Sequence, residues 1–326
     1  MGALTGAVAG PAGQGCSWLG VGKCAGFPPR PPSPQPARPM NPAPQSTTPA
    51  LLHTSFYKFA RVPEPEAVAA RLRDLAAATQ PPMMGSVLVA PEGINGMLAG
   101  TQDMLNKVEQ ALLQDPAFGG MFTGMVFKRS ACKTAPFHRM KVHVKPEIVP
   151  LGIEGIDAIS KTGLNVSPED WRELITQDDV VLLDNRNSFE YRVGRFNHAI
   201  DPQVGNFRDF PAYVLANAPA WKAAGKRVAM YCTGGIRCEK TSAWMLDLGL
   251  TVYQLEGGVM SYFAKMPDAH LDWQGECFVF DNRVALNTRL EETNTSLEDV
   301  YRGAPDGEWR LKRAQRLAGA DVHDLA

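Results

Sequence analysis

Residues 227–240 read RVAMYCTGGIRCEK. After Arg227 the run continues with a short, unbroken apolar segment at residues 228–231, which is typical of a parallel strand buried on both faces. A helix is predicted to resume near Cys238 and to continue to Leu248. The pattern therefore places Cys232 at the junction of a strand and a helix.

The loop between them contains two adjacent glycines, which let a backbone curl so that its N–H groups point inward, and the next helix adds its positive end. Such a site lowers the pKa of a thiol and favours a thiolate or persulfide. We therefore predict that Cys232 is a catalytic thiolate; the alternative is a small buried hydrophobic residue. The residues of this active-site loop are Thr233, Gly234, Gly235, Ile236 and Arg237.

Two side chains at the end of the loop are further candidates. Arg237 is expected to steady the anionic sulfur or a bound oxyanion, and the alternative is an arginine paired with Glu239 or with a surface acid. Cys238 is a possible resolving thiol for a persulfide or disulfide on Cys232, or else it packs at the start of the helix.

The surrounding pattern predicts an α/β domain. Ser167 and Pro168 suit the N-cap and first turn of a helix, and helical segments alternate with short apolar runs such as residues 180–183. Asp184 lies at the end of that run. Arg186 is expected to pair with an acid such as Glu190.

The preceding part of the chain shows a different order of elements. Strand patterns at residues 56–59, 86–90, 94–99, 125–128 and 140–144 alternate with helix patterns at residues 65–79 and 103–114. The order β-α-β-β-α-β favours a ferredoxin-like sandwich, and residues 152–163 are predicted to be a linker.

A basic stretch lies within this first domain. Residues 119–146 contain no acid and carry His138, His143 and Phe137 among the positive charges. Phosphate contacts and aromatic stacking make this the best candidate surface for RNA, the alternative being a solvated strand face. The RNA-binding candidates are Lys128, Arg129, Lys133, Arg139, Lys141 and Lys145.

The composition of the whole chain limits its partners, its compartment and its cofactors. The net charge of −1 provides no whole-molecule attraction for a polyanion, so RNA contact needs a local patch. Six cysteines without regular spacing favour free thiols in a reducing compartment. The Pro- and Gly-rich residues 1–50 are predicted to be disordered and non-functional. No membrane span, zinc spacing, Walker loop or dinucleotide fingerprint is recognised, so we expect a cytoplasmic protein with no metal and no stable cofactor.

Several motifs resemble known families. DNR at 184–186, EYRVGRF at 190–196 and the Cys232 loop are similar to the signatures of rhodanese domains. CTGGIRCEK at 232–240, APEGING at 90–96, PFHRMKV at 136–142, EGGV at 256–259 and FVFDNRV at 278–284 resemble the tRNA uridine hydroxylases. One departure is that members of this family end in a cysteine-rich tail, whereas no cysteine follows Arg283.

The resemblance implies a fold and an activity. The likeness to rhodanese domains also implies that Asp184 hydrogen-bonds to the active loop in a structural role. We expect a disordered extension at residues 1–50, a ferredoxin-like domain at 51–150, a rhodanese-like catalytic domain at 165–273 and a C-terminal tail at 274–326. The expected reaction is oxygen-dependent hydroxylation of the wobble uridine, in the anticodon loop of tRNA, to 5-hydroxyuridine, with Cys232 as the active-site residue and molecular oxygen as co-substrate.

Three other functions stay open. A sulfurtransferase would move sulfane sulfur from thiosulfate or another donor through a Cys232 persulfide. A cysteine phosphatase is less favoured, because four residues separate Cys232 from Arg237 whereas phosphatases of related fold use a loop of five. A non-catalytic binding module would leave tRNA unchanged when Cys232 is replaced by serine.

Overall fold

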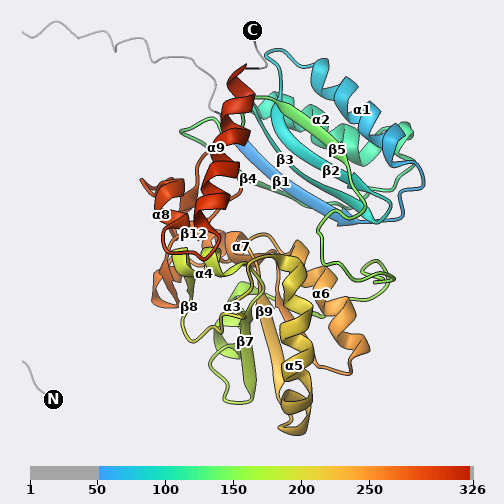
Figure 1. Cartoon of the computed structure of the whole chain (residues 1–326). Coiled ribbons are helices and arrows are strands. Elements are labelled where there is room, and N and C mark those ends of the chain that lie inside the picture. Colours follow the sequence, from blue (N-terminus) through green and yellow to red (C-terminus); the bar gives the residue numbers. More distant parts are fainter. Residues whose placement is uncertain (1–50, 324–326) are drawn as a thin grey trace, which may run out of the picture. The chain divides into compact units, whose positions relative to one another are not determined.

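The computed structural model describes residues 51–323, which belong to one compact unit (Figure 1). Residues 1–50, for which the sequence predicts disorder, lie outside the described residues. The described chain begins with an α+β domain and continues with an α/β domain, as the order of patterns predicts.

The first domain is a five-stranded sheet with two long helices. Its elements in chain order are β1 (Leu52–Phe59), α1 (Pro65–Ala77), β2 (Met84–Ala90), β3 (Gly93–Gly100), α2 (Gln102–Gln114), the 3-10 helix η1 (Pro116–Phe118), β4 (Phe127–Ala131) and β5 (Met140–Val144).

The strand order is β4-β1-β3-β2-β5, and the first four strands pair antiparallel. This arrangement confirms the ferredoxin-like fold, and β5 adds an edge strand parallel to β2. Both helices bury their apolar stripes in one core with alternate residues of the sheet, among them Val87 and Val89. Strand β4 begins two residues later than predicted, because Met125 is buried in that core after the turn at Gly124.

The second domain is built on a parallel sheet. Its elements are β6 (Leu164–Val166), α3 (Pro168–Leu174), β7 (Val180–Asp184), α4 (Ser188–Val193), β8 (Gly194–Phe196), the 3-10 helix η2 (Phe207–Asp209), α5 (Phe210–Ala223), β9 (Arg227–Tyr231), α6 (Ile236–Asp247), β10 (Val252–Leu255) and α7 (Gly258–Lys265).

The sheet order is β6-β10-β9-β7, and every pair is parallel. Helices α5 and α6 cover one face and α3 and α7 the other, so that Met230 and Tyr231, neighbours on β9, enter different cores. Ser167 caps α3 with Pro168 in its first turn, as predicted. Cys232 directly follows the carboxyl end of β9 and precedes the start of α6.

The remaining segments are packed onto these domains. The predicted linker at residues 152–163 contains no helix or strand, and Ala158 is buried. Residues beyond α7 form the 3-10 helix η3 (Ala269–Leu271), β11 (Trp273–Gly275), β12 (Cys277–Phe278), β13 (Ala285–Leu286), α8 (Leu297–Tyr301) and α9 (Gly307–His323).

Candidate active site

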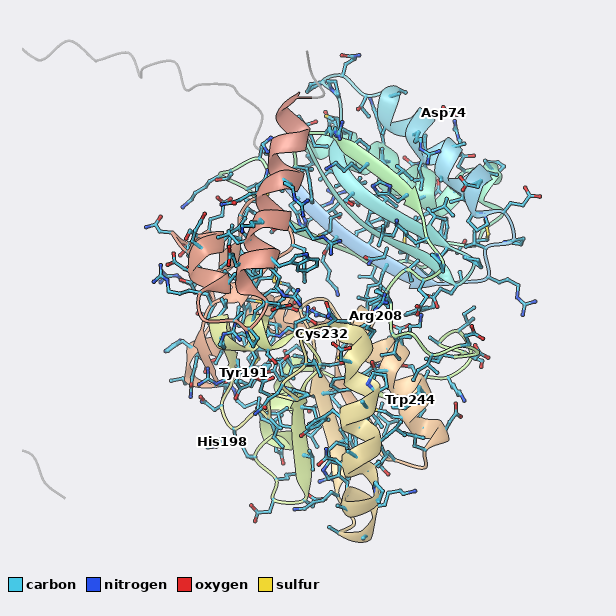
Figure 2. The ribbon with its side chains drawn as sticks, viewed as in Figure 1. Asp74, Tyr191, His198, Arg208, Cys232 and Trp244 are labelled. Carbon is cyan, nitrogen blue, oxygen red and sulfur yellow. The ribbon has the colours of Figure 1, made fainter. Side chains whose placement is uncertain are left out.

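Cys232 lies between β9 and α6 and is fully buried (Figure 2). The backbone N–H of Gly235 donates to its sulfur at 3.1 Å. Gly235 has a φ of 103° and is the N-cap of the twelve-residue helix α6, so the positive end of the helix dipole points at the thiol. A residue with a Cβ is disfavoured at that φ, which accounts for the glycine.

These donors act on the ionisation of Cys232. Burial favours the neutral thiol, but hydrogen bonds from the thiol and backbone of Cys238, the charge of Arg237 and the Gly235 N–H together hold the pKa of Cys232 well below its usual range. Burial and the neighbouring thiolate raise the pKa of Cys238, which therefore stays protonated and donates to Cys232. The pair is an anionic acceptor beside a neutral donor.

Arg237 forms an ion pair with a buried carboxylate that its local sequence does not indicate. Its Nη1 and Nη2 donate to the two oxygens of Glu190 at 2.7 and 2.9 Å, and Nη2 also donates to the hydroxyl of Thr233 at 3.2 Å. Glu190 is fully buried in α4. The expected alternative partner, Glu239, instead accepts a hydrogen bond from Tyr57 at 2.8 Å.

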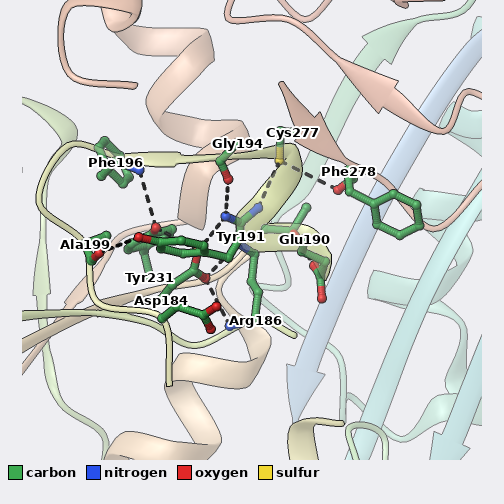
Figure 3. A network of polar contacts seen from close by, with 12 residues as sticks. Asp184, Arg186, Glu190, Tyr191, Gly194, Phe196, Ala199, Tyr231, Cys277 and Phe278 are labelled. Carbon is green, nitrogen blue, oxygen red and sulfur yellow. Dashed lines mark hydrogen bonds and ion pairs between the residues drawn. The ribbon is translucent and has the colours of Figure 1, made fainter. Parts of the chain in front are cut away.

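A second buried network supports the strand before the cysteine (Figure 3). Arg186 makes two hydrogen bonds to Asp184, at 2.8 and 2.6 Å, and donates to the carbonyl oxygen of Gly194 at 2.6 Å. The prediction that Arg186 pairs with an acid is confirmed, but the acid is Asp184, two residues away, and not Glu190. Asp184 also accepts from Tyr231 at 2.8 Å and so reaches the residue before the loop.

A second glycine loop, which leads into α7, binds the backbone of the cysteine loop. The backbone N–H groups of Val259 and Met260, at the start of α7, donate to the carbonyls of Cys232 and Thr233 at 3.0 and 3.1 Å. Gly258 has a φ of 68°, and a Cβ there would meet the Cys232 carbonyl at 2.4 Å. The adjacent glycines at residues 257–258 were the sequence signal for this contact, although their role was not predicted.

The basic candidates do not form a single surface. The ammonium of Lys128 donates to the carbonyl oxygens of Gly234 and Gly257, and the guanidinium of Arg129 binds Glu109 on α2, so both side chains bind groups within the protein. Lys133 and Lys145 are exposed, and Arg139 and Lys141 are half-buried. A phosphate-binding role stays a prediction for all six residues.

Within residues 51–323, no group of three or more His, Cys, Asp or Glu side chains has the arrangement of a metal site. The four cysteines in that range, Cys132, Cys232, Cys238 and Cys277, are free thiols. None of the helices described here is long and apolar enough to cross a membrane.

Comparison with known proteins agrees with both domains. Residues 51–148 match the family model described as UPF0176 acylphosphatase like domain, and residues 167–265 match the rhodanese-like domain. Among solved structures, a rhodanese-related protein of Thermoplasma volcanium is 23% identical, with a TM-score of 0.25, covering 32% of this chain and 93% of that one.

Curated relatives extend across the two domains. The tRNA uridine(34) hydroxylase of Brucella ovis is 41% identical over 244 residues, which cover 74% of this chain and 77% of the relative. The proteins of the same name from Brucella canis and from Brucella melitensis biotype 2 match with the same identity and coverage. The shared length contains the buried thiolate loop and the domain that precedes it, and this chain belongs to the tRNA uridine(34) hydroxylase family.

Proposed function

We propose that this chain hydroxylates the wobble uridine of tRNA, uridine 34, to 5-hydroxyuridine, with Cys232 as the active-site thiolate or persulfide. The observation that carries the proposal is the environment of the Cys232 sulfur. It accepts the Gly235 N–H at 3.1 Å at the start of α6, in a chain whose relatives bear that activity in their name. A thiol whose pKa is held well below its usual range supplies the thiolate that nucleophilic or persulfide chemistry needs.

The overall reaction sets requirements on its co-substrates. Molecular oxygen supplies one atom to carbon 5 of the uracil ring, and the other atom leaves as water after uptake of two protons and two electrons from an external two-electron reductant. We propose no resident cofactor or metal, and we place the reaction in the cytoplasm. Exposed Lys133 and Lys145 are proposed to contact tRNA phosphates near the anticodon loop, an interaction that weakens as salt rises.

The test is nucleoside mass spectrometry of tRNA from cells that lack the gene. Wild-type chain is expected to restore 5-hydroxyuridine derivatives and Cys232→Ser to leave them absent. Cys132→Ser is the matched control, because Cys132 is a half-exposed free thiol outside the loop, and it is expected to restore the product. Unchanged 5-hydroxyuridine in the deletion strain, in a host with no other enzyme making it, would refute the proposal.

A sulfurtransferase is the second candidate, favoured by the match to a rhodanese-like domain. It predicts transfer of sulfane sulfur from thiosulfate to a thiol acceptor without RNA, through a Cys232 persulfide. Sulfur transfer by the wild-type chain in that assay, with Cys232→Ser as the blank and with unchanged 5-hydroxyuridine in the deletion strain, would favour the sulfurtransferase over the hydroxylase.

A further inference from the structure

The side chain of Lys128 leaves the first domain on β4 and ends on the loop that holds Cys232. Its Nζ donates to the carbonyl oxygen of Gly234 at 2.6 Å and to that of Gly257 at 3.0 Å. The same nitrogen lies 5.7 Å from the centre of the Tyr57 ring. One ammonium group therefore joins the two glycine loops that surround the cysteine.

The bond to Gly234 has a direct consequence for the sulfur. The carbonyl of Gly234 and the N–H of Gly235 belong to one peptide unit, which is planar and trans, so they point in opposite directions. Holding the carbonyl toward Lys128 aims the N–H at Cys232, where it donates at 3.1 Å. Rotation of this peptide would remove the donor from the sulfur.

The fit between the domains at this point is close. A Cβ on Gly235 would meet the Tyr57 hydroxyl at 2.9 Å, and one on Gly257 would meet the Lys128 side chain at 3.3 Å. Tyr57 on β1 is itself fixed by its 2.8 Å hydrogen bond to Glu239 on α6. The first domain thus contacts the active loop through two ordered polar side chains.

The charges around Lys128 indicate an electrostatic role as well. Burial lowers the pKa of Lys128, and the negative charges of Cys232, Glu239 and Glu256, in that order, oppose the shift. Its two hydrogen-bond acceptors are neutral carbonyl oxygens, whereas the guanidinium of Arg237 is paired with Glu190. The positive charge of Lys128 therefore acts on the Cys232 sulfur as well as on the carboxylates of Glu239 and Glu256.

We propose that Lys128 is a positioning residue for Cys232, and that the two domains build the active site together. Lys128 orients the Gly234–Gly235 peptide toward the sulfur and stabilises the thiolate by its charge. The role rests on the proposed function, because it serves the reaction of the same thiolate.

The experiment compares Lys128→Gln and Lys128→Arg with Arg129→Gln in the full chain. Arg129 is the matched control because it carries the same charge at the next position but binds Glu109 and Asn106. The first readout is the ultraviolet absorbance of the thiolate against pH, with Cys232→Ser as the blank. Lys128→Gln is expected to raise the midpoint by roughly one pH unit, Lys128→Arg by less, and Arg129→Gln not at all.

Two more readouts separate positioning from RNA binding. Lys128→Gln is expected to lower 5-hydroxyuridine formation roughly tenfold or more, because a misplaced donor weakens the reacting geometry. Its affinity for tRNA and the salt dependence of that affinity are expected to match wild type, whereas a phosphate contact would weaken binding and reduce the salt slope.

An unchanged thiolate midpoint in a folded Lys128→Gln protein overturns the inference, as does a midpoint shift of equal size in Arg129→Gln. Absence of hydroxylation by the wild-type chain would instead overturn the proposed function. The thiolate titration would still decide the role of Lys128 in that case, because it requires no tRNA.

Discussion

Replacement of Arg237 by methionine removes one half of a buried ion pair and leaves Glu190 charged in the interior. The two side chains are 9% and 0% exposed and share hydrogen bonds of 2.7 and 2.9 Å. Exposed ion pairs contribute about 0–1 kcal/mol, whereas removing one partner from a buried pair costs about 3–5 kcal/mol. Glu190 keeps the Asn187 N–H at 3.1 Å, so we expect a loss of about 3 kcal/mol, near the lower end of that range.

Equilibrium unfolding in urea measures this loss as a lower midpoint at an unchanged slope. The charges of Arg237 and Arg186 hold the pKa of Glu190 below its ordinary value of 4.5 against the effect of burial. A depressed folded pKa gives stability that is present above 4.5 and disappears as the pH falls through the folded value. The difference between wild type and Arg237→Met is therefore expected to shrink in acid.

The double variant Arg237→Met with Glu190→Met is the control for this reasoning. It has no unpaired buried charge, and it is expected to regain most of the lost stability. Both variants lack the charge of Arg237, which lowers the pKa of Cys232, so the thiolate midpoint of Cys232 is expected to be raised in both. A loss of less than about 1 kcal/mol in Arg237→Met would refute the reasoning, because the pair would then behave like one on the surface.

Three more predictions test the rest of the site. The thiolate absorbance of the wild type is expected to persist well below pH 9, the ordinary pKa of a thiol, and a titration midpoint near pH 9 contradicts the assigned hydrogen bonds. The loss of stability in Cys232→Ser is expected to grow as the pH rises to 9. Lys240 on α6 joins the domains through ion pairs with Glu92 and Glu147, at 2.7 and 2.6 Å. Lys240→Met is expected to lower the free energy of unfolding in urea by roughly 1.5–3 kcal/mol, and a loss within error of zero contradicts that role. Gly258→Ala is expected to abolish hydroxylation in a folded protein, because its Cβ would meet the Cys232 carbonyl at 2.4 Å. If the variant keeps wild-type activity, the loop can shift to accommodate the Cβ, which contradicts this prediction.

The local elements of the fold were predictable because each is encoded in a short stretch. Strand β5 occupies residues 140–144, as its pattern indicates, and Ser167 caps α3 as a serine before proline should. The start of β4 was missed because Met125 resembles a strand residue, and only the folded core shows that it packs with Phe118 and Phe122. Tertiary packing overrides a local β pattern at such a boundary.

The partners of the charged side chains were not predictable in the same way. Glu190 and Arg237 lie on different helices, 47 residues apart, and nothing in either local sequence indicates the pairing. Proximity in sequence even suggested the wrong partner, since Glu190 is close to Arg186, which binds Asp184 instead. A loop such as CTGGIR indicates where an anion is held but not which side chains hold the loop.

The basic run in the first domain shows why position in a strand matters more than total charge. Lys128 and Arg129 are neighbours, and composition alone assigns both to one RNA-binding patch. Successive residues of a strand point to opposite faces, so on β4 Lys128 reaches the cysteine loop while Arg129 reaches Glu109 on α2. Two adjacent positive charges thus belong to two different parts of the structure, and only one of them lies beside the sulfur. Their exchange for glutamine, one at a time, therefore separates the chemistry of Cys232 from the general effect of losing a positive charge.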